Sequence, residues 1–428
     1  MKKILCLCLA AVLLVGQAFA SFSDLPQTHW ASEAVDQMAQ AGILEGYPDG
    51  SFRPDDILTR AQFLTMVVRG MWPEEVPQTD GAWWRPYYEV AQQKQLLLRD
   101  DGTPFVGADE TQMNNPITRY EMAVVLIQAY RTMGVGSIAD FRVSFTDEDQ
   151  FPEIYHDSTD SAAEAGLLSG YPDGSFGGTR ELKRAEGAAA VQRLLARQAL
   201  TAQDVLIAAN GEILLTYQNT DRGIQLQSRS VTDASVLQEL TVSVDTSRME
   251  DWEAGFSKSW AILAANDHAF WGTAGYFTYD EDGKITQMTD QPILDAKEAE
   301  NGSVVAITCK KGTCVSYSGA GSTYPAGDQV IRISTSGKIT TLLDNEPAHG
   351  LTLTEVTGAE SGDIRVVHTY FMGMADLHRY EYLIEHGKLW ALEHIPGMGF
   401  SGYTPEEAEK EQQRLDDVGC GLGTIHES

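Results

Sequence analysis

The sequence contains few cysteines and few basic residues. Its 428 residues include 5 cysteines, 31 lysines and arginines, and 61 aspartates and glutamates, for a formal net charge of −30. A chain this acidic offers no general positive field to a nucleic acid, so we expect no nucleic acid among its partners. Beyond its first twenty residues it has no run of about 18 consecutive apolar residues, so we expect no transmembrane span.

The start of the chain has the pattern of an export signal. Two lysines precede an apolar run over residues 4–15, and the sequence AFA at residues 18–20 has the small-x-small form of a signal-peptidase site. We therefore predict a signal peptide over residues 1–20 and a mature chain, starting near Ser21, outside the cytoplasmic membrane.

Three cysteines follow the predicted signal peptide: Cys309, Cys314 and Cys420. Cys309 and Cys314 flank the sequence KKGT, which is typical of a hairpin turn, and in an oxidising compartment they form a candidate disulfide. Buried free thiols are the alternative, and both readings stay open. The spacing CxxxxC is not a metal-binding pattern and no H-E-x-x-H sequence is present, so we expect neither a metal site nor a cofactor.

One module is repeated three times in the first two hundred residues. Two copies share an F-[ST]-D segment, a loop that contains GYPDGSF, and a basic motif. These segments begin at Phe22, Ala41 and Leu58 in the first copy and at Phe145, Ala165 and Leu182 in the third. The second copy is divergent and is recognised in WWRPYYEVA, QLLLRDDGTPF and ITRYEMA, from Trp83, Gln95 and Ile117. Such repeats usually mark units that bury their apolar faces against one another.

Each module has the pattern helix, structured loop, helix. In the first, Thr28 is placed to cap a helix with an apolar stripe from Trp30 to Ala41, and Gly42 to end it. Thr59 is placed to cap a second helix. The landmark arginines of the basic motif are spaced 59 and 65 residues apart, at Arg60, Arg119 and Arg184. We therefore expect an all-α bundle of three helical hairpins.

These residues resemble the S-layer homology module of bacterial cell-surface proteins. The likeness lies in FSD, HW, the G-x-x-x-G-Y-P-D-G-S-F-x-P loop and a variant of T-R-A-E, and it covers roughly residues 22–197. It implies repeats over residues 21–75, 76–140 and 141–200. It also implies binding of a secondary cell-wall polysaccharide, typically one that carries a pyruvate ketal, in grooves between repeats.

The resemblance and the chemistry of such a ligand give a set of candidate polysaccharide-binding residues. An arginine fork matches a carboxylate, a tryptophan face matches a sugar ring, and carboxylates and loop amides match hydroxyls. The candidates are Arg60, Arg119 and Arg184 for the carboxylate, Trp30 for the ring, and Asp24, Asp147, Gly46 and Gly170 for hydroxyls. The alternative for each arginine is a structural salt bridge between repeats. The sequence departs from the family pattern at Gln62 and Lys183, at Tyr155 (the aromatic nearest the third Trp30 equivalent), and in the second repeat, which lacks the YPDGSF loop.

The chain changes character near residue 200. Short apolar segments alternate with glycine and aspartate turns over residues 201–428, which predicts a β-rich domain. Three Gly-Lys turns contain Gly283, Gly337 and Gly387, at spacings of 54 and 50 residues. This period favours a β-propeller of four or five blades, with a plain antiparallel sandwich or meander as the alternative. A short acidic helix is expected from Thr404.

The sequence as a whole predicts a secreted, wall-attached protein of a Gram-positive bacterium. Its first half is expected to attach to wall polysaccharide and its second half to display a β-rich binding domain for an unknown ligand. The alternative is a wall-anchored hydrolase acting on polysaccharide or peptidoglycan through the second half. We predict no enzyme activity for the repeats, and we find no catalytic pattern in the second half that locates an active site.

Overall fold

The computed structural model describes most of the chain after the predicted signal peptide. It covers residues 22–78, 80–138, 143–209, 213–221, 223–243, 262, 264–266, 268–299, 301–309, 315–319, 322–327, 329–344, 350–357, 363–371, 377–385, 388–395 and 424–425. The predicted signal peptide, the acidic helix from Thr404, the Gly387 turn, Cys314 and Cys420 lie outside these residues.

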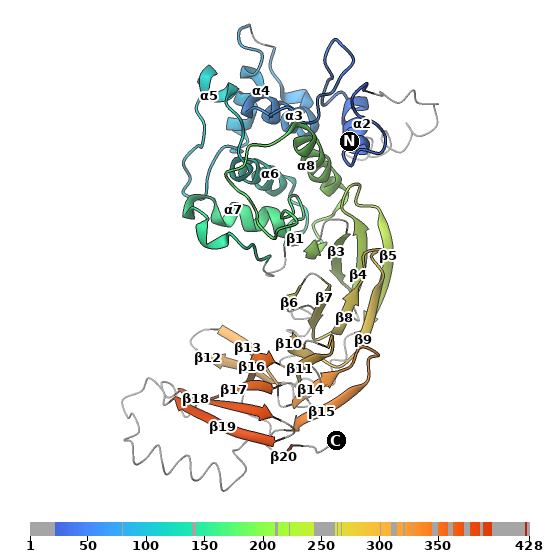
Figure 1. Ribbon diagram of the computed structural model, residues 1–428, viewed down its shortest axis with the longest axis vertical. Coiled ribbons are helices and arrows are strands. Elements are labelled where there is room, and N and C mark those ends of the chain that lie inside the picture. Colours follow the sequence, from blue (N-terminus) through green and yellow to red (C-terminus); the bar gives the residue numbers. More distant parts are fainter. Residues whose placement is uncertain are drawn as a thin grey trace. The chain divides into compact units, whose positions relative to one another are not determined.

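The chain forms two compact units. Unit 1 comprises Met1–Val135 and Ser144–Leu200, and unit 2 comprises Gly136–Val143 and Thr201–Ser428. Figure 1 shows helices in the first part of the chain and strands in the second. The helices are α2 (Ser32–Gln40), α3 (Arg60–Met71), α4 (Arg85–Gln93), α5 (Glu110–Asn114), α6 (Arg119–Met133), α7 (Glu153–Glu164) and α8 (Arg184–Ala196), with 3-10 turns at Pro73–Glu75, Glu148–Gln150 and Arg197–Ala199.

Each repeat of unit 1 consists of a first helix, a loop and a second helix. The first helices α2, α4 and α7 are each followed by a residue with positive φ, namely Gly42, Gln95 and Gly166. At two of the second helices, Thr59 and Thr118 form capping boxes with the third helical residue, as predicted for Thr59. Thr28 was predicted to cap the first helix, but α2 starts later, after Ala31, without a side-chain cap.

The repeats are joined by a closed ring of backbone hydrogen bonds. Leu58 N–H donates to Leu182 O at 2.7 Å, Leu182 N–H to Ile117 O at 3.3 Å, and Ile117 N–H to Leu58 O at 3.0 Å. Around the ring, single β-bridges link Ile57 to Lys183, Thr59 to Pro116, and Thr118 to Glu181. The three segments before the second helices therefore meet as short extended pieces, each bonded to both others.

The prediction of an all-α first half is therefore wrong. Periodicity identified the helices, but the extended segments that start three residues before each of them pair across repeats rather than within one. A pairing between segments about 60 residues apart leaves no local signal in the sequence. Unit 1 is a mixed structure in which helices surround a three-way β-bridge ring.

Second helices form the centre of unit 1. α3, α6 and α8 are buried over most of their length, including Phe63 on α3 and Leu126 and Ile127 on α6. The approach of α8 to the first repeat is close, because a Cβ on Gly187 would lie 2.4 Å from Leu58 Cδ2. The three repeats thus share one core, as each alone would leave its second helix exposed.

Unit 2 is built from sheets that are antiparallel except where β1 pairs with β2, and most neighbouring strands are consecutive in sequence. The strands are β1 (Ser137–Ile138), β2 (Val205–Ala209), β3 (Ile213–Asn219), β4 (Gly223–Ser230), β5 (Val236–Ser243), β6 (Ala264–Ala265), β7 (Ala269–Gly272), β8 (Gly275–Tyr279), β9 (Ile285–Thr289), β10 (Ile293–Glu298), β11 (Val304–Thr308), β12 (Val315–Gly319), β13 (Ser322–Ala326), β14 (Gln329–Ile333), β15 (Ile339–Asp344), β16 (Gly350–Thr357), β17 (Asp363–Phe371), β18 (Leu377–Glu385), β19 (Lys388–Ile395) and β20 (Thr424–Ile425). Their sheet orders are β1-β2-β3-β4-β5, β6-β7-β8-β9, β10-β11-β14-β15-β20, β12-β13 and β16-β17-β18-β19.

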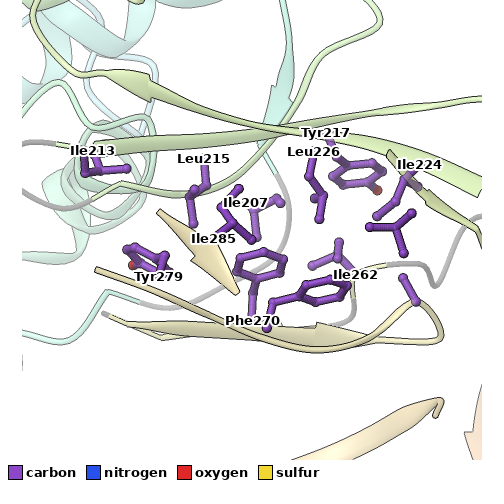
Figure 2. Close-up of a cluster of buried hydrophobic side chains, with 13 residues drawn as sticks. Ile207, Ile213, Leu215, Tyr217, Ile224, Leu226, Ile262, Phe270, Tyr279 and Ile285 are labelled. Carbon is purple, nitrogen blue, oxygen red and sulfur yellow. The ribbon is translucent and has the colours of Figure 1, made fainter. Parts of the chain in front are cut away.

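Apolar side chains hold successive sheets of unit 2 together. The β2–β5 sheet faces the β6–β9 sheet through a cluster that includes Leu215, Ile224 and the stacked pair Phe270 and Phe277, whose ring centroids lie 4.9 Å apart. Figure 2 shows the side chains of the two sheets pointing toward one another. A second cluster joins β6–β9 to β10–β15 through residues such as Tyr276 and Ile331.

The prediction of a β-propeller is also wrong. A propeller needs its last sheet to pack on its first, and no such closure is present in the part of unit 2 that the structure describes. The outer edge of β2 is taken by β1, which pairs with it in parallel (Ser137 with Val205). The last described strand, β20, pairs with β15 instead of with the first sheet. The Gly-Lys turns at Gly283 and Gly337 connect β8 to β9 and β14 to β15, with φ of 77° and 81°. The spacing of the Gly-Lys turns therefore reflects repeated hairpins rather than propeller blades.

Candidate functional site

Arg60 is engaged by the second repeat. Its Nε and Nη2 donate to the two carboxylate oxygens of Glu121 at 2.9 and 2.6 Å, and its Nη1 donates to Gln112 O at 3.0 Å. The exposed fractions of the two side chains are 16% and 7%. This is a bidentate, largely buried ion pair between repeats, the geometry in which arginine binds a carboxylate most strongly.

Arg184 reaches from the third repeat into the loop of the first. Its Nε donates to Phe52 O at 3.0 Å and its Nη2 to Glu45 O at 3.2 Å, while its guanidinium lies 5.1 Å from the ring centre of Tyr47 and 4.8 Å from that of Phe52. The residue is 6% exposed, and burial lowers the pKa of its guanidinium. No carboxylate bonds this arginine among the residues described.

Arg119 makes the equivalent contacts from the second repeat to the third. Its Nη2 donates to Ser169 O, and its guanidinium lies 4.8 Å from the ring centre of Tyr171 and 4.9 Å from that of Phe176. Burial lowers the pKa of Arg119, and its buried Nε has no hydrogen-bond partner. The three landmark arginines therefore form a cycle in which each side chain contacts the following repeat.

Asp24 and Asp147 bind backbone amides of their own repeats. The carboxylate of Asp24 accepts from the N–H groups of Phe52 and Arg53 at 2.7 and 2.8 Å. That of Asp147 accepts from Phe176 and Gly177 at 2.7 and 2.9 Å. Each aspartate thus holds the far end of a GYPDGSF loop, and its oxygens are directed at the protein.

Gly46 and Gly170 allow an aromatic ring to approach the loop. A Cβ on Gly46 would lie 2.3 Å from Phe22 Cε1, and one on Gly170 would lie 3.2 Å from Phe145 Cε1. In both repeats the following tyrosine N–H donates to the serine carbonyl of the turn at 2.8 Å. A side chain at either glycine would therefore contact the phenylalanine ring, and the contact would be closer at Gly46 than at Gly170.

Two tryptophans lie exposed at equivalent positions of the first and second repeats. Trp30 and Trp83 each stand ten residues before the end of the first helix, and they are 65% and 55% exposed. The ring of Trp30 stacks on His29 with centroids 5.6 Å apart. At the equivalent position of the third repeat the chain has Ile154, whereas Tyr155 stacks on Tyr120 with centroids 5.2 Å apart. Sequence reasoning missed Trp83, although the WW pair marked it.

The junction between the third and first repeats carries several charged groups. Lys183 Nζ lies 2.7 Å from Asp55 Oδ1, and the ammonium of Lys183 followed by the ring of His29 lowers the pKa of Asp55. Lys183 gives no side-chain cap to α8, consistent with its replacing the motif threonine. The structure thus brings Lys183 to the neighbourhood of His29, next to the exposed Trp30.

The GYPDGSF turns are ordered by their aspartates. Asp49 Oδ1 accepts from the N–H and hydroxyl of Ser51 at 3.0 and 2.5 Å, and Asp173 does the same with Ser175 at 2.9 and 2.6 Å. These bonds, together with Arg53, lower the pKa of Asp49 to about 2. The turns are therefore held by hydrogen bonds between their own side chains and backbone groups.

One of the predicted sites, the candidate disulfide between Cys309 and Cys314, falls in unit 2. Cys309 is 1% exposed and disulfide-bonded, while Cys314 lies outside the described residues. Among the described residues no group of three or more histidine, cysteine, aspartate or glutamate side chains is arranged to hold a metal ion. The described helices also include none with the length and apolar composition to cross a membrane.

Unit 1 is thus a cyclic arrangement of three helical hairpins, with an exposed tryptophan on each of the first two. Residues 21–64 and 144–188 match the S-layer homology domain, so the chain carries this domain in its first and third repeats. The match leaves out residues 65–143, which contain the divergent second repeat.

Relatives of known name share this part of the chain. Outer membrane protein SlpA of Thermus thermophilus is 36% identical over 134 residues, which are 29% of this chain and 14% of that protein. The S-layer protein of Bacillus thuringiensis subsp. finitimus is 26% identical over 143 residues, or 30% and 17% of the two chains. Amylopullulanase of Thermoanaerobacterium thermosulfurigenes is 25% identical over 188 residues, or 41% and 9%.

These likenesses support a cell-surface protein anchored through S-layer homology domains, which are not themselves enzymes. The chain spans less than a fifth of the length of each relative. Because the relatives come from Thermus as well as Bacillus, the expectation of a Gram-positive host is not confirmed.

Proposed function

We propose that unit 1 attaches this protein to the cell surface by binding a secondary cell-wall polysaccharide, and that unit 2 is displayed there. The observation that carries the proposal is the pair of exposed tryptophans, Trp30 and Trp83, at the same position of two repeats. Tryptophan is enriched at binding surfaces, and a flat indole offers a face on which a sugar ring can stack.

The roles of the other candidate residues follow from their contacts. Asp24, Asp147, Gly46 and Gly170 serve the loops that present the site, and Arg60 serves the junction of the first two repeats. Direct contact of Arg60, Arg119 or Arg184 with polysaccharide stays a prediction. We propose the boundaries 21–75, 76–140 and 141–200 for the three repeats, and a removable signal peptide over residues 1–20.

The hydrolase alternative is not favoured. The similarity to amylopullulanase and to exoglucanase XynX of Acetivibrio thermocellus covers 9% and 16% of those proteins. A segment that small, shared also with S-layer proteins, is the part that enzymes and S-layer proteins have in common. We propose no enzyme activity for unit 1, and we assign no ligand to unit 2.

The proposal is tested by co-sedimentation of the full chain with purified cell walls, before and after acid extraction of secondary polymers. We expect binding to native walls and its loss after extraction. Trp30→Ala and Trp83→Ala should each weaken binding by roughly 5- to 30-fold, since an exposed aromatic contact contributes about 1–2 kcal/mol. Ile57→Ala, which alters an exposed apolar side chain of the same unit, should bind within about twofold of the original chain. Binding that survives extraction would contradict the polysaccharide assignment.

A further inference from the structure

Two guanidinium groups lie over one tyrosine in each GYPDGSF loop. Tyr47 has the buried Arg184 at 5.1 Å and the exposed Arg53 at 3.9 Å from its ring centre. In the third repeat the ring of Tyr171 has the buried Arg119 at 4.8 Å and the exposed Arg180 at 4.2 Å. The inner arginine of each pair comes from the preceding repeat in the cycle, and the outer one belongs to the loop itself.

The outer arginines come from different sequence positions. Arg53 and Gly177 occupy the same place, because each follows the loop phenylalanine and donates its N–H to the aspartate of the F-[ST]-D segment, Asp24 or Asp147. Both have positive φ, 59° and 67°. Gly177 has no side chain, and the guanidinium is supplied three residues later by Arg180, whose Cδ and Nε occupy the space that a Cβ on Gly177 would enter.

The left-handed backbone conformation of Arg53 indicates that its side chain has a function beyond supporting the fold. A left-handed backbone costs a non-glycine residue roughly 1 kcal/mol. Glycine fills this position in the third repeat, so the fold does not need arginine here. Arg53 thus keeps a strained backbone conformation, and the third repeat, which has Gly177 at that position, supplies a guanidinium from Arg180 instead. This pattern is expected when the side chain is functional.

The outer guanidinium groups keep donors for a ligand. Arg53 donates Nη2 to Asp49 at 3.0 Å and Nε to Ser51 Oγ at 3.3 Å, and its Nη1 has no partner among the described residues. Arg180 lies 3.6 Å from Asp173. Their side chains are 44% and 52% exposed. A guanidinium stacked on a ring is held in one plane, which favours bidentate binding of a carboxylate.

The two loops differ in the negative charge beside them. At the third residue of the second helix the repeats have Gln62, Glu121 and Glu186. Glu121 neutralises Arg60, and Glu186 acts on Arg119 and accepts from the Tyr171 hydroxyl at 3.2 Å. The first repeat has the neutral Gln62 there. The Tyr47 loop has the carboxylate of Asp56 instead, whose charge acts on both Arg53 and Arg184.

We propose that Arg53 and Arg180, stacked on Tyr47 and Tyr171, bind the carboxylate groups of an acidic wall polysaccharide. This rests on the proposed polysaccharide binding and names the group of the polymer that is recognised. The carboxylate comes either from a ketal-linked pyruvate or from a uronic acid. Arg119 and Arg184 hold the tyrosine rings from within the fold.

The test measures binding of the full chain by calorimetry to three probes: pyruvylated wall polymer, the same polymer after hydrolysis of its ketals, and polygalacturonate. Arg53→Gln and Arg180→Gln should each weaken binding to the carboxylate-bearing probe by roughly 10- to 100-fold, the range for a charge-assisted bidentate contact. Gln62→Glu, at the neutral position of the first repeat, should weaken binding about 3- to 10-fold. The probe that shows dependence on Arg53 identifies the source of the carboxylate.

Arg69 supplies a matched control. It also lies over a tyrosine, Tyr87, at 5.4 Å and pairs with Glu45 at 3.2 Å, with 31% of its side chain exposed. Arg69→Gln should bind within about twofold of the original chain. If Arg53→Gln and Arg180→Gln bind like the original chain, the inference is wrong while polysaccharide binding stands. If the original chain itself binds none of the probes and no native wall, both proposals fail together. A loss that is equal for a ketal-free polymer without uronic acid would also overturn the inference, because it would mark a structural effect.

Discussion

Unit 1 joins three repeats through a ring of backbone hydrogen bonds, whereas the first three sheets of unit 2 pack through apolar side chains, and among the described residues the last sheet does not join the first. In unit 1 the ring residues Leu58, Ile117 and Leu182 each donate to one neighbour and accept from the other. In unit 2 the contacts between sheets are the rings and aliphatic chains of two clusters. Because each ring residue uses its backbone N–H and C=O on the other two repeats, the ring closes with three repeats. Packing of apolar side chains between sheets does not require the first and last sheets to meet.

The largest expected effect comes from emptying the core between the first two sheets of unit 2. Phe277→Ala removes a fully buried ring stacked on Phe270 and should lower the free energy of unfolding of unit 2 by about 3–5 kcal/mol. Hydrogen exchange followed by mass spectrometry should then show faster exchange in β2–β9 and unchanged exchange in α3, α6 and α8. Phe63→Ala in unit 1 is the matched control and should give the reverse pattern. Faster exchange in both units from either variant would mean that the two units unfold as one.

The second effect concerns the charged link between the first two repeats. Glu121→Gln leaves Arg60 largely buried without its carboxylate and should destabilise unit 1 by about 3 kcal/mol, because removing one partner of a buried pair strands the other charge. Urea unfolding of the full chain, read by exchange of α3 and α6, measures the loss. Glu186→Gln, where the equivalent carboxylate is more exposed, should cost about 1 kcal/mol or less. Equal losses would show that the charge pair contributes no more than the helix cap.

A third effect tests the membership of β1 in unit 2. Ile138 lies between the second and third repeats in sequence, but its side chain packs against the first cluster of unit 2. Ile138→Ser should lower the stability of unit 2 by about 1–2 kcal/mol and speed exchange in β2 and β3. Exchange that speeds up in α6 and α7 instead would contradict this assignment.

The smallest effect compares equivalent glycines in two loops. Gly46→Ala would force Phe22 Cε1, 2.3 Å from the new Cβ, to move, and should cost about 1–3 kcal/mol. Gly170→Ala meets Phe145 at 3.2 Å and should cost less than about 1 kcal/mol. Thermal unfolding of both variants under one set of conditions gives the comparison. A larger loss at Gly170 would mean that Phe22 relocates at little cost.

Local structure was the part of the fold that the sequence predicted best. The cap at Thr59, the end of α2 before Gly42, and strands such as β3 follow from side-chain chemistry and periodicity within a dozen residues. Closure was the part it missed. The ring of unit 1 and the sheet order of unit 2 depend on pairings between distant segments. Patterns within a short stretch of sequence do not predict such pairings.

The candidate site shows the same limit. The arginine landmarks identified the repeats, yet the sequence alone left open whether Arg60 meets a ligand or a neighbouring repeat. The structure gives Arg60 the carboxylate of Glu121, 61 residues away in sequence. Arg53 and Arg180 were missed because they stand at different positions of their loops. Only the shared tyrosine beneath them makes the two side chains equivalent.

The segment Gly136–Val143 makes the two units harder to separate by proteolysis. Unit 1 and unit 2 are connected by the chain at residues 135–136, 143–144 and 200–201. A protease that cleaves at residues 200–201 leaves β1 covalently attached to unit 1 at both ends while it remains a strand of the sheet in unit 2. Release of unit 2 from unit 1 therefore requires β1 to be pulled from β2 as well, so a single cut does not separate the two units.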